Sequence, residues 1–139
     1  MKKYLLTCLI LVTLQSCKQT VTSEDLPKLN GYWEIEKVIL PNGEKKEYKI
    51  NESIDYLEVK DSIGFRKKVY PQLNGKFLVN DLKENFIIST ANNSYFINYK
   101  TDYAKWKEEI IEIQDSSFVV KNDAKLEYHY KRHQPFSTK

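Results

Sequence analysis

Short stretches in which apolar and polar residues alternate, separated by turn-forming residues, constrain the fold of this chain more than any other feature. The first stretch runs from Gly31 to Leu40. Trp33, Ile35 and Ile39 fall on one face of it, which is the pattern of a half-buried strand. Similar stretches follow at 44–50, 54–60, 65–70, 76–79, 86–90, 95–100, 107–114, 118–121 and 126–132. This spacing predicts an all-β protein, a sandwich or a barrel of about 8–10 short strands.

Asparagine and glycine mark the turns between these stretches. Asn-Gly pairs at 42–43 and 74–75 favour hairpins, because this dipeptide tolerates the positive φ that tight primed turns need. Asn-Asn at 92–93 and Asn-Asp at 122–123 separate two later pairs of stretches. Hairpin connections between successive strands are therefore expected.

The segment 102–113 allows two structures. Its apolar residues recur at the spacing of a helical stripe, and an aspartate at its start would cap that helix. Ile111 and Ile113, however, also alternate with a charged residue, as they would in a strand. We expect a strand at 107–114, while 102–106 fits either helix or strand.

The first residues have the form of an export signal. Two lysines precede an apolar run from Tyr4 to Leu14, which is shorter than the roughly 20 residues that a helix needs to cross a bilayer. The run ends in Leu-Gln-Ser-Cys at 14–17, which resembles the lipobox of bacterial lipoproteins. That resemblance implies a signal peptide at 1–16, cleavage before Cys17, and attachment of palmitate or another acyl chain that anchors the protein to a membrane.

The rest of the chain has the length of one domain. Polar residues dominate 17–28, where we expect a lipidated flexible tether. The β domain is expected at 29–133 and a disordered tail at 134–139. Lys18 follows the acylation site, where an aspartate would resemble the signal for retention at the inner membrane. We therefore expect the outer membrane. The acidic pair Glu24-Asp25 comes too late to resemble a signal for export to the cell surface, so the periplasmic side is favoured.

Charge and cysteine content narrow the function further. Two of the 22 basic residues and none of the 19 acidic ones lie in the leader, so the mature chain is close to neutral. No basic run stands beside a row of stacking aromatic residues, so nucleic acid is not an expected partner. Cys8 is lost with the leader and Cys17 carries lipid, which leaves no thiol for a disulfide, a metal or a nucleophile.

Neither enzymatic activity nor a metal or other cofactor is expected. The sequence has no Gly-x-Ser-x-Gly, Ser-x-x-Lys or His-Glu-x-x-His motif. His129 and His133 would lie roughly 13 Å apart along a strand, too far to share an ion. Glu108 and the charged residues around it are interpreted as a mixed surface face, and the basic run at 65–70 as a solvated strand face.

Residues at the two ends of the domain point to a family. Gly31 and Trp33 open the first strand, and Arg132 closes the last. This pattern resembles the lipocalins, in which Gly-x-Trp starts the first strand and a basic residue from the final strand covers the Trp ring. The resemblance implies an antiparallel up-and-down β-barrel with Trp33 and Arg132 as a cation–π pair on its floor, because closure brings the first and last strands together.

The chain is also similar to the small lipocalin-like lipoproteins of Gram-negative bacteria, which combine a lipobox and a short tether with a Leu-x-Gly-x-Trp opening and a Tyr-x-Arg ending. The middle lipocalin motif and the C-terminal helix are missing, so the barrel is either hollow or filled by its own side chains.

The first function expected is that of a non-enzymatic accessory or binding subunit, beside outer-membrane proteins. The alternative is a carrier for a small apolar ligand or lipid. The candidate contacts for a ligand or partner are Tyr95, Tyr99, Trp106, Tyr128 and Tyr130.

Overall fold

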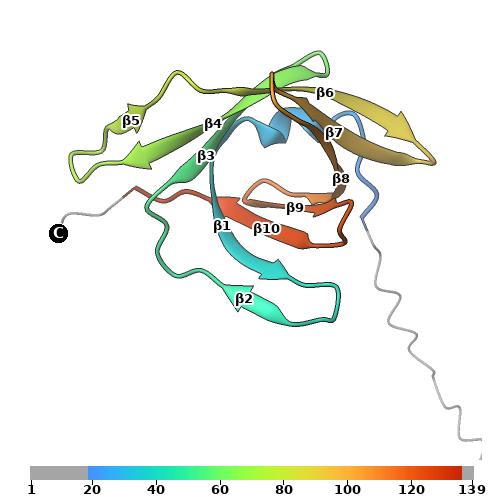
Figure 1. Cartoon of the computed structure of the whole chain (residues 1–139), viewed down its shortest axis with the longest axis horizontal. Coiled ribbons are helices and arrows are strands. Elements are labelled where there is room, and N and C mark those ends of the chain that lie inside the picture. The colour runs from blue at the N-terminus through green and yellow to red at the C-terminus, as the bar shows by residue number, and fades with distance from the viewer. Residues whose placement is uncertain (1–18, 136–139) are drawn as a thin grey trace, which may run out of the picture.

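The computed structural model describes residues 19–135 and is almost entirely β-structure (Figure 1). One short 3₁₀ helix precedes the ten strands. The elements are η1 (Leu26–Leu29), β1 (Gly31–Ile39), β2 (Lys45–Glu47), β3 (Ile54–Lys60), β4 (Ile63–Pro71), β5 (Phe77–Val79), β6 (Glu84–Ala91), β7 (Ser94–Lys100), β8 (Lys105–Ile113), β9 (Ser117–Asn122) and β10 (Glu127–Arg132). The prediction of an all-β fold with short strands is confirmed.

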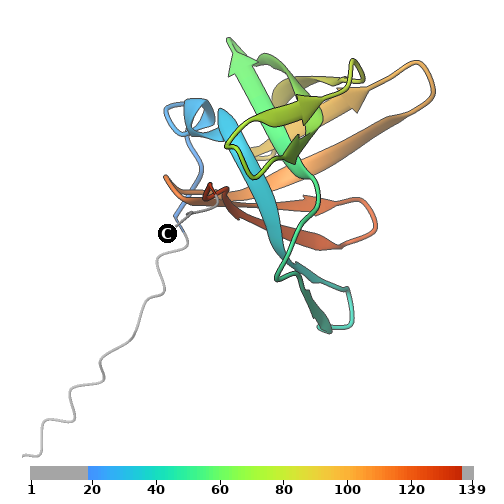
Figure 2. The same ribbon diagram turned by 90° about the vertical axis from the view of Figure 1, so that its left-hand side faces the viewer.

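The strands form one antiparallel sheet that closes into a barrel (Figures 1 and 2). The order β10-β9-β8-β7-β6-β4-β3-β1 is closed by pairing of β10 with β1, while the short β2 and β5 are added to β1 and β4. Closure runs from Trp33 opposite Arg132 to Ile39 opposite Glu127. The predicted lipocalin-like barrel is therefore present, with eight strands in the closed ring.

The two ends of the barrel differ. At one end lie η1, the start of β1, the end of β10 and the tight β3–β4, β6–β7 and β8–β9 turns, and we call this the closed end. Asn92 and Asn93 adopt φ of 50° and 62° in the β6–β7 turn, which is the left-handed conformation that asparagine tolerates best after glycine. The other end, where the β4–β5–β6 segment and the β7–β8 loop lie, is called the open end.

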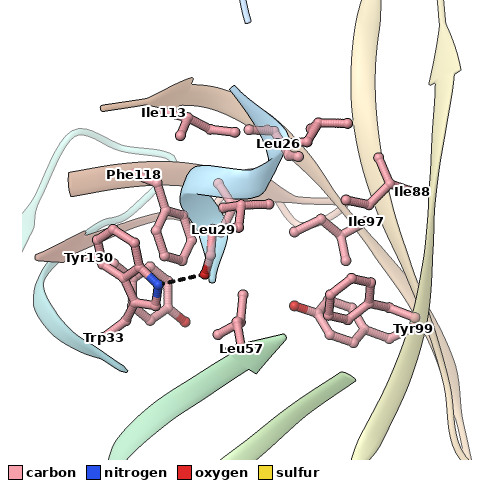
Figure 3. Close-up of a cluster of buried hydrophobic side chains, with 13 residues drawn as sticks. Leu26, Leu29, Trp33, Leu57, Ile88, Ile97, Tyr99, Ile113, Phe118 and Tyr130 are labelled. Atoms are coloured by element: carbon pink, nitrogen blue, oxygen red, sulfur yellow. Dashed lines mark hydrogen bonds between the residues drawn. The ribbon is translucent and has the colours of Figure 1, made fainter. Parts of the chain in front are cut away.

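Apolar side chains fill the closed end. Leu29 and Trp33 are completely buried, and Nε1 of Trp33 donates a hydrogen bond to the carbonyl of Leu29 at 2.8 Å (Figure 3). The Trp33 ring meets the ring of Phe118 edge-on, with 4.7 Å between centroids, and Phe118 stacks on Tyr130 at 4.5 Å. Edge-on and stacked geometries are the favourable ones for aromatic pairs, so this end is a packed core with Trp33 at its centre.

One face assignment within β1 was wrong. A β-bulge interrupts the pairing with β10 between Ile35 and Lys37, and the extra residue shifts the alternation by one position. As a result Val38, and not Ile39, is the buried residue at the far end of the strand. A bulge leaves no signature in the apolar pattern of one strand, because it depends on the partner strand.

The ambiguous segment before β8 is not helical. Thr101 donates its backbone N–H to the carbonyl of Ala104 at 2.9 Å, which closes a tight turn between β7 and β8. β8 then begins at Lys105, so the strand predicted at 107–114 is present and starts two residues earlier. The helical spacing of the apolar residues was coincidental.

The residues expected to form the tether are partly folded onto the barrel. η1 lies within this segment, Leu26 is buried, and Val21 packs against the core. The sequence at 17–28 is polar, but its two apolar side chains cap the closed end, so the predicted tether was too long. Cys17, the leader at 1–16 and the residues 136–139 lie outside the described part of the chain. Between residues 19 and 135 no helix is both long and apolar enough to cross a bilayer.

Candidate functional site

Arg132 covers the floor of the barrel. Its guanidinium carbon lies 3.8 Å from the centroid of the Trp33 ring, within the range of a cation–π contact. Nε donates to the carbonyl of Asp115 at 2.9 Å and Nη2 to the carbonyl of Lys28 at 2.6 Å, while Nη1 donates to the carbonyl of Asn30. One side chain therefore joins η1, the β8–β9 turn and the first strand, which is the arrangement that the lipocalin resemblance implied.

A second arginine lies inside the barrel, where the sequence alone did not place one. Arg66 on β4 is opposite Glu84 on β6, and the two side chains form two hydrogen bonds of 3.1 and 3.2 Å. Nη1 of Arg66 also lies 3.6 Å from Oε1 of Glu108, which projects inward from β8. A single guanidinium thus faces two carboxylates in the interior, above the apolar floor.

Burial dominates the titration of this cluster. It raises the pKa of Glu108, and the attraction of Arg66 offsets only part of that shift while Asp55 and Glu84 add to it. Burial also raises the pKa of Tyr99 and of Tyr130 above the usual range of a phenol. Both tyrosines therefore remain neutral hydrogen-bonding groups at any physiological pH.

A further ion pair lies beside the cluster. Nζ of Lys68 is 2.7 Å from Oδ1 of Asp55, and Asp55 is almost fully buried. The same oxygen has no partner with hydrogen-bond geometry in the described part of the chain, so the contact is electrostatic but poorly aligned. About half of the Lys68 side chain is exposed, and it extends from the buried carboxylate to the surface of a cleft.

The cleft at the open end has a volume of about 1270 Å³. Its lining comes from β4 and β6–β8, including Ile63 and Gly64 at the start of β4, and from the β5–β6, β7–β8 and β9–β10 loops. Tyr99 and Trp106 line it and stack on each other, with 5.0 Å between centroids and 11° between planes. Arg66 lies over the Tyr99 ring at 4.5 Å, so the buried charge cluster supports the aromatic pair from within the barrel.

The five aromatic residues proposed as contacts do not form one site. Tyr99 and Tyr130 belong to the buried core, and Trp106 and Tyr128 pack against it, but only Tyr99 and Trp106 also line the cleft. Tyr95 lines a separate small pocket of about 220 Å³ near Thr20 at the closed end. Figure 3 shows Tyr99 across Leu57 from the group formed by Trp33, Phe118 and Tyr130.

Two surface assignments made from the sequence were wrong. The run at 65–70 is not a uniformly solvated face, because Arg66 and Lys68 point inward and carry the charged interior. Glu108 is buried, while Glu109 beside it is only half-buried. The charged side chains of β4 and β8 were assigned to the solvent face because of their charge, and the alternation along each strand was not applied to them. For Glu108 the available signal was its alternation with the buried Ile110 on the same strand, whereas β4 gives no such signal for Arg66, because its buried residue Val69 has the opposite parity.

A family model agrees with this architecture. The family model described as a lipocalin-like domain matches residues 29–120. The chain therefore belongs to the lipocalin-like domain family, whose barrels generally bind or carry small molecules rather than catalyse reactions.

Two solved structures are similar to this chain. A lipocalin-like protein from Bacteroides uniformis ATCC 8492 has a TM-score of 0.47 at 9% sequence identity. An uncharacterized protein from Bacteroides eggerthii DSM 20697 has a TM-score of 0.48 at 8% identity. Each comparison covers 76% of this chain and 99% of the other. No curated protein sequence matches this chain.

Proposed function

We propose that the protein is a lipid-anchored binding protein of the bacterial envelope that holds a small ligand in the cleft at the open end. The cleft is the observation that carries this proposal, because its volume of about 1270 Å³ is ample for a small organic molecule. The floor is filled by Trp33 and its aromatic neighbours. The ligand is therefore bound above the floor, at the level of Tyr99 and Trp106.

The charged residues around Tyr99 and Trp106 argue against a purely apolar ligand, which was the alternative function expected from the sequence. A carrier for a purely apolar ligand needs an apolar interior, whereas Lys68 and Glu84 line this cleft and Arg66 lies directly behind it. The binding function is retained, and the ligand carries polar groups as well as apolar surface.

The binding function is tested by native mass spectrometry of the full chain after incubation with an extract of envelope small molecules. We expect a bound species at about one per chain. Trp106→Leu should reduce its occupancy, and Phe96→Leu, which changes a half-buried aromatic residue outside the cleft on β7, should not. A folded protein that retains no small molecule under these conditions would refute the proposal.

The anchor is tested separately. Cys17 is two residues before the described part of the chain, and the described chain first packs against the barrel at Val21, at the closed end. Acylation of Cys17 would therefore hold the closed end near the membrane and direct the cleft away from it. Cys17→Ala should abolish labelling by palmitate and release the protein from membranes. Labelling that persists in this variant would contradict lipidation at Cys17.

An accessory role beside outer-membrane proteins is the second candidate, and a specific surface favours it. Several large apolar side chains are exposed on the β4–β6 segment at the open end: Tyr70, Leu73, Leu78, Val79 and Leu82. Clustered exposed apolar residues are typical of protein contacts. Co-purification with outer-membrane proteins after gentle solubilisation, lost in Leu78→Ser but kept in Ile50→Ser, would support this role, because Ile50 is also exposed but lies outside both this segment and the cleft.

A further inference from the structure

We propose that the cleft selects a planar aromatic anion, which stacks on Trp106 and is neutralised by Lys68. This assignment rests on the proposed binding function and adds the chemical class of the ligand. It is carried by the fixed aromatic pair, by the position of the Asp55–Lys68 ion pair and by the excess of positive charge along the rim.

Trp106 is a preformed stacking surface. It is half-buried and lines the cleft, so part of its indole is open to a ligand. Its partner Tyr99 is fixed by the guanidinium of Arg66 at 4.5 Å and by the edge of the Phe86 ring at 5.4 Å. An aromatic surface that is already ordered loses little conformational entropy when a second ring stacks on it, and such pairs add about 0.5–1.5 kcal/mol to the burial of area.

Lys68 is the cation best placed to meet a ligand. Arg66 is already engaged by Glu84 and Glu108, so its charge is not available. Among the described residues the ammonium of Lys68 contacts only Asp55, in a poorly aligned pair, and it can donate further hydrogen bonds from the wall of the cleft. A carboxylate or similar anion in the cleft would complete its coordination.

The rim adds to this preference. Four other lysines line the cleft, against three acidic residues, Glu84, Asp102 and Asp123, of which Glu84 is paired with Arg66. Within residues 19–135 none of these lysines forms an ion pair with a carboxylate: Lys83, Lys100, Lys105 and Lys107. Like charges gathered along one opening attract anions and disfavour cations.

Three naphthalene derivatives of equal ring size test the proposal directly. Calorimetric titrations of the full chain, corrected with protein-free detergent, would compare 2-naphthoate, 2-naphthalenemethanol and 2-naphthylmethylammonium. We expect naphthoate to bind at least tenfold more tightly than the neutral alcohol and the ammonium compound to bind most weakly. Equal affinities, or tighter binding of the ammonium compound, would overturn the ligand class.

Variants then assign the two contacts. Trp106→Leu should weaken naphthoate binding at least tenfold, and the outer-face variant Phe96→Leu should leave it unchanged. Lys68→Gln alone would leave the Asp55 carboxylate buried without a counter-ion, so the test uses the double variant Asp55→Asn/Lys68→Gln. This variant should bind naphthoate and the alcohol equally, whereas Lys121→Gln on β9 should keep the preference. A double variant that keeps the full preference would exclude Lys68 as the counter-ion.

The outcome separates this proposal from the binding function itself. Failure of all three naphthalene compounds to bind, with a small molecule still retained from the envelope extract, would refute the aromatic anion and leave the binding function standing. Loss of both would refute the two together.

Discussion

Arg66 and Glu84 are direct cross-strand partners on β4 and β6, and their side chains meet inside the barrel through two hydrogen bonds of 3.1 and 3.2 Å. Both residues are shielded from solvent, and Glu108 approaches the same guanidinium at 3.6 Å. A slip of one residue between β4 and β6 would turn one of these charges outward and leave the other without its partner. The pair therefore supports the register of the strands that border the cleft.

Removal of Arg66 should destabilise the fold strongly. Arg66→Met leaves the buried Glu108 and the partly buried Glu84 without their counter-ion, and loss of one partner from a buried ion pair costs about 3–5 kcal/mol. Urea unfolding measures the change. Lys67→Met, on the outer face of the same strand, is the matched control and should shift stability by less than about 0.5 kcal/mol. A loss below about 1 kcal/mol for Arg66→Met would show that the interior is wetter than the geometry indicates.

Gly31 is required where the first strand meets Arg132. Its φ is +125°, and a Cβ at this position would lie 2.5 Å from Nη1 of Arg132. That guanidinium is held by three backbone carbonyls, so it cannot move without losing hydrogen bonds. We expect Gly31→Ala to destabilise the protein by about 2–4 kcal/mol, as the sum of backbone strain and of hydrogen bonds to a charged group.

Gly43 provides the control for Gly31, because its φ is +87° but a Cβ there would meet nothing within 4 Å. Gly43→Ala should cost only the backbone strain of about 1 kcal/mol. In an Arg132→Ala background the excess effect of Gly31→Ala should disappear. Equal losses for the two alanine variants in the wild-type background would mean that the guanidinium is free to move aside.

The sequence predicted the barrel because strand length, turn residues and the residues at the two ends all agree. The strand at 54–60 was predicted with its observed bounds, since a run of alternating residues between turn signals predicts a strand of that length. The bulge in β1 and the packing of Leu26 against the closed end were missed. Both depend on contacts with strands that are distant in the chain.

The site was harder to predict than the fold. Tyr99 and Trp106 were identified as contact residues, but the sequence could not separate them from Tyr128 and Tyr130, which contact the same core without lining the cleft. The charged interior was missed because a lysine or glutamate inside a barrel is exceptional without a partner, and the partners lie on different strands. Only the three-dimensional pairing shows that Arg66 has two carboxylates to meet.

The ionised carboxylate of Asp25 should stabilise the fold at pH values above the range in which this group titrates. Its pKa is lowered from 3.8 to about 2, first by the hydrogen bond from Lys28 and then by those from Thr22. Because the folded pKa is below the unfolded one, this stabilisation is present above pH 3.8 and is lost as the pH falls towards 2. Asp25→Asn should remove that part of the acid dependence in urea unfolding from pH 2 to 5, whereas the exposed variant Asp81→Asn should keep it. An unchanged acid profile in Asp25→Asn would show that the contacts of Asp25 do not persist in solution.

Glu108 should act in the opposite direction. Burial raises its pKa above 4.5, so the folded protein binds this proton more tightly than the unfolded chain does. As the pH rises from 4.5 through the folded pKa, the stability contributed by protonated Glu108 is lost. Glu108→Gln should remove this decline while Glu84 still pairs with Arg66, so the variant should be at least as stable as the wild type at pH 8.

Urea unfolding between pH 5 and 8, together with a ¹³C titration of the Glu108 carboxyl group, measures both sides of this linkage. Glu109→Gln, on the outward side of the same strand, is the control and should follow the wild-type slope. A carboxyl resonance that titrates below 4.5 would mean that attraction by Arg66 outweighs burial. Glu108→Gln would then be less stable than the wild type at pH 8, and the interior beneath the cleft would carry a net negative charge that disfavours an anionic ligand.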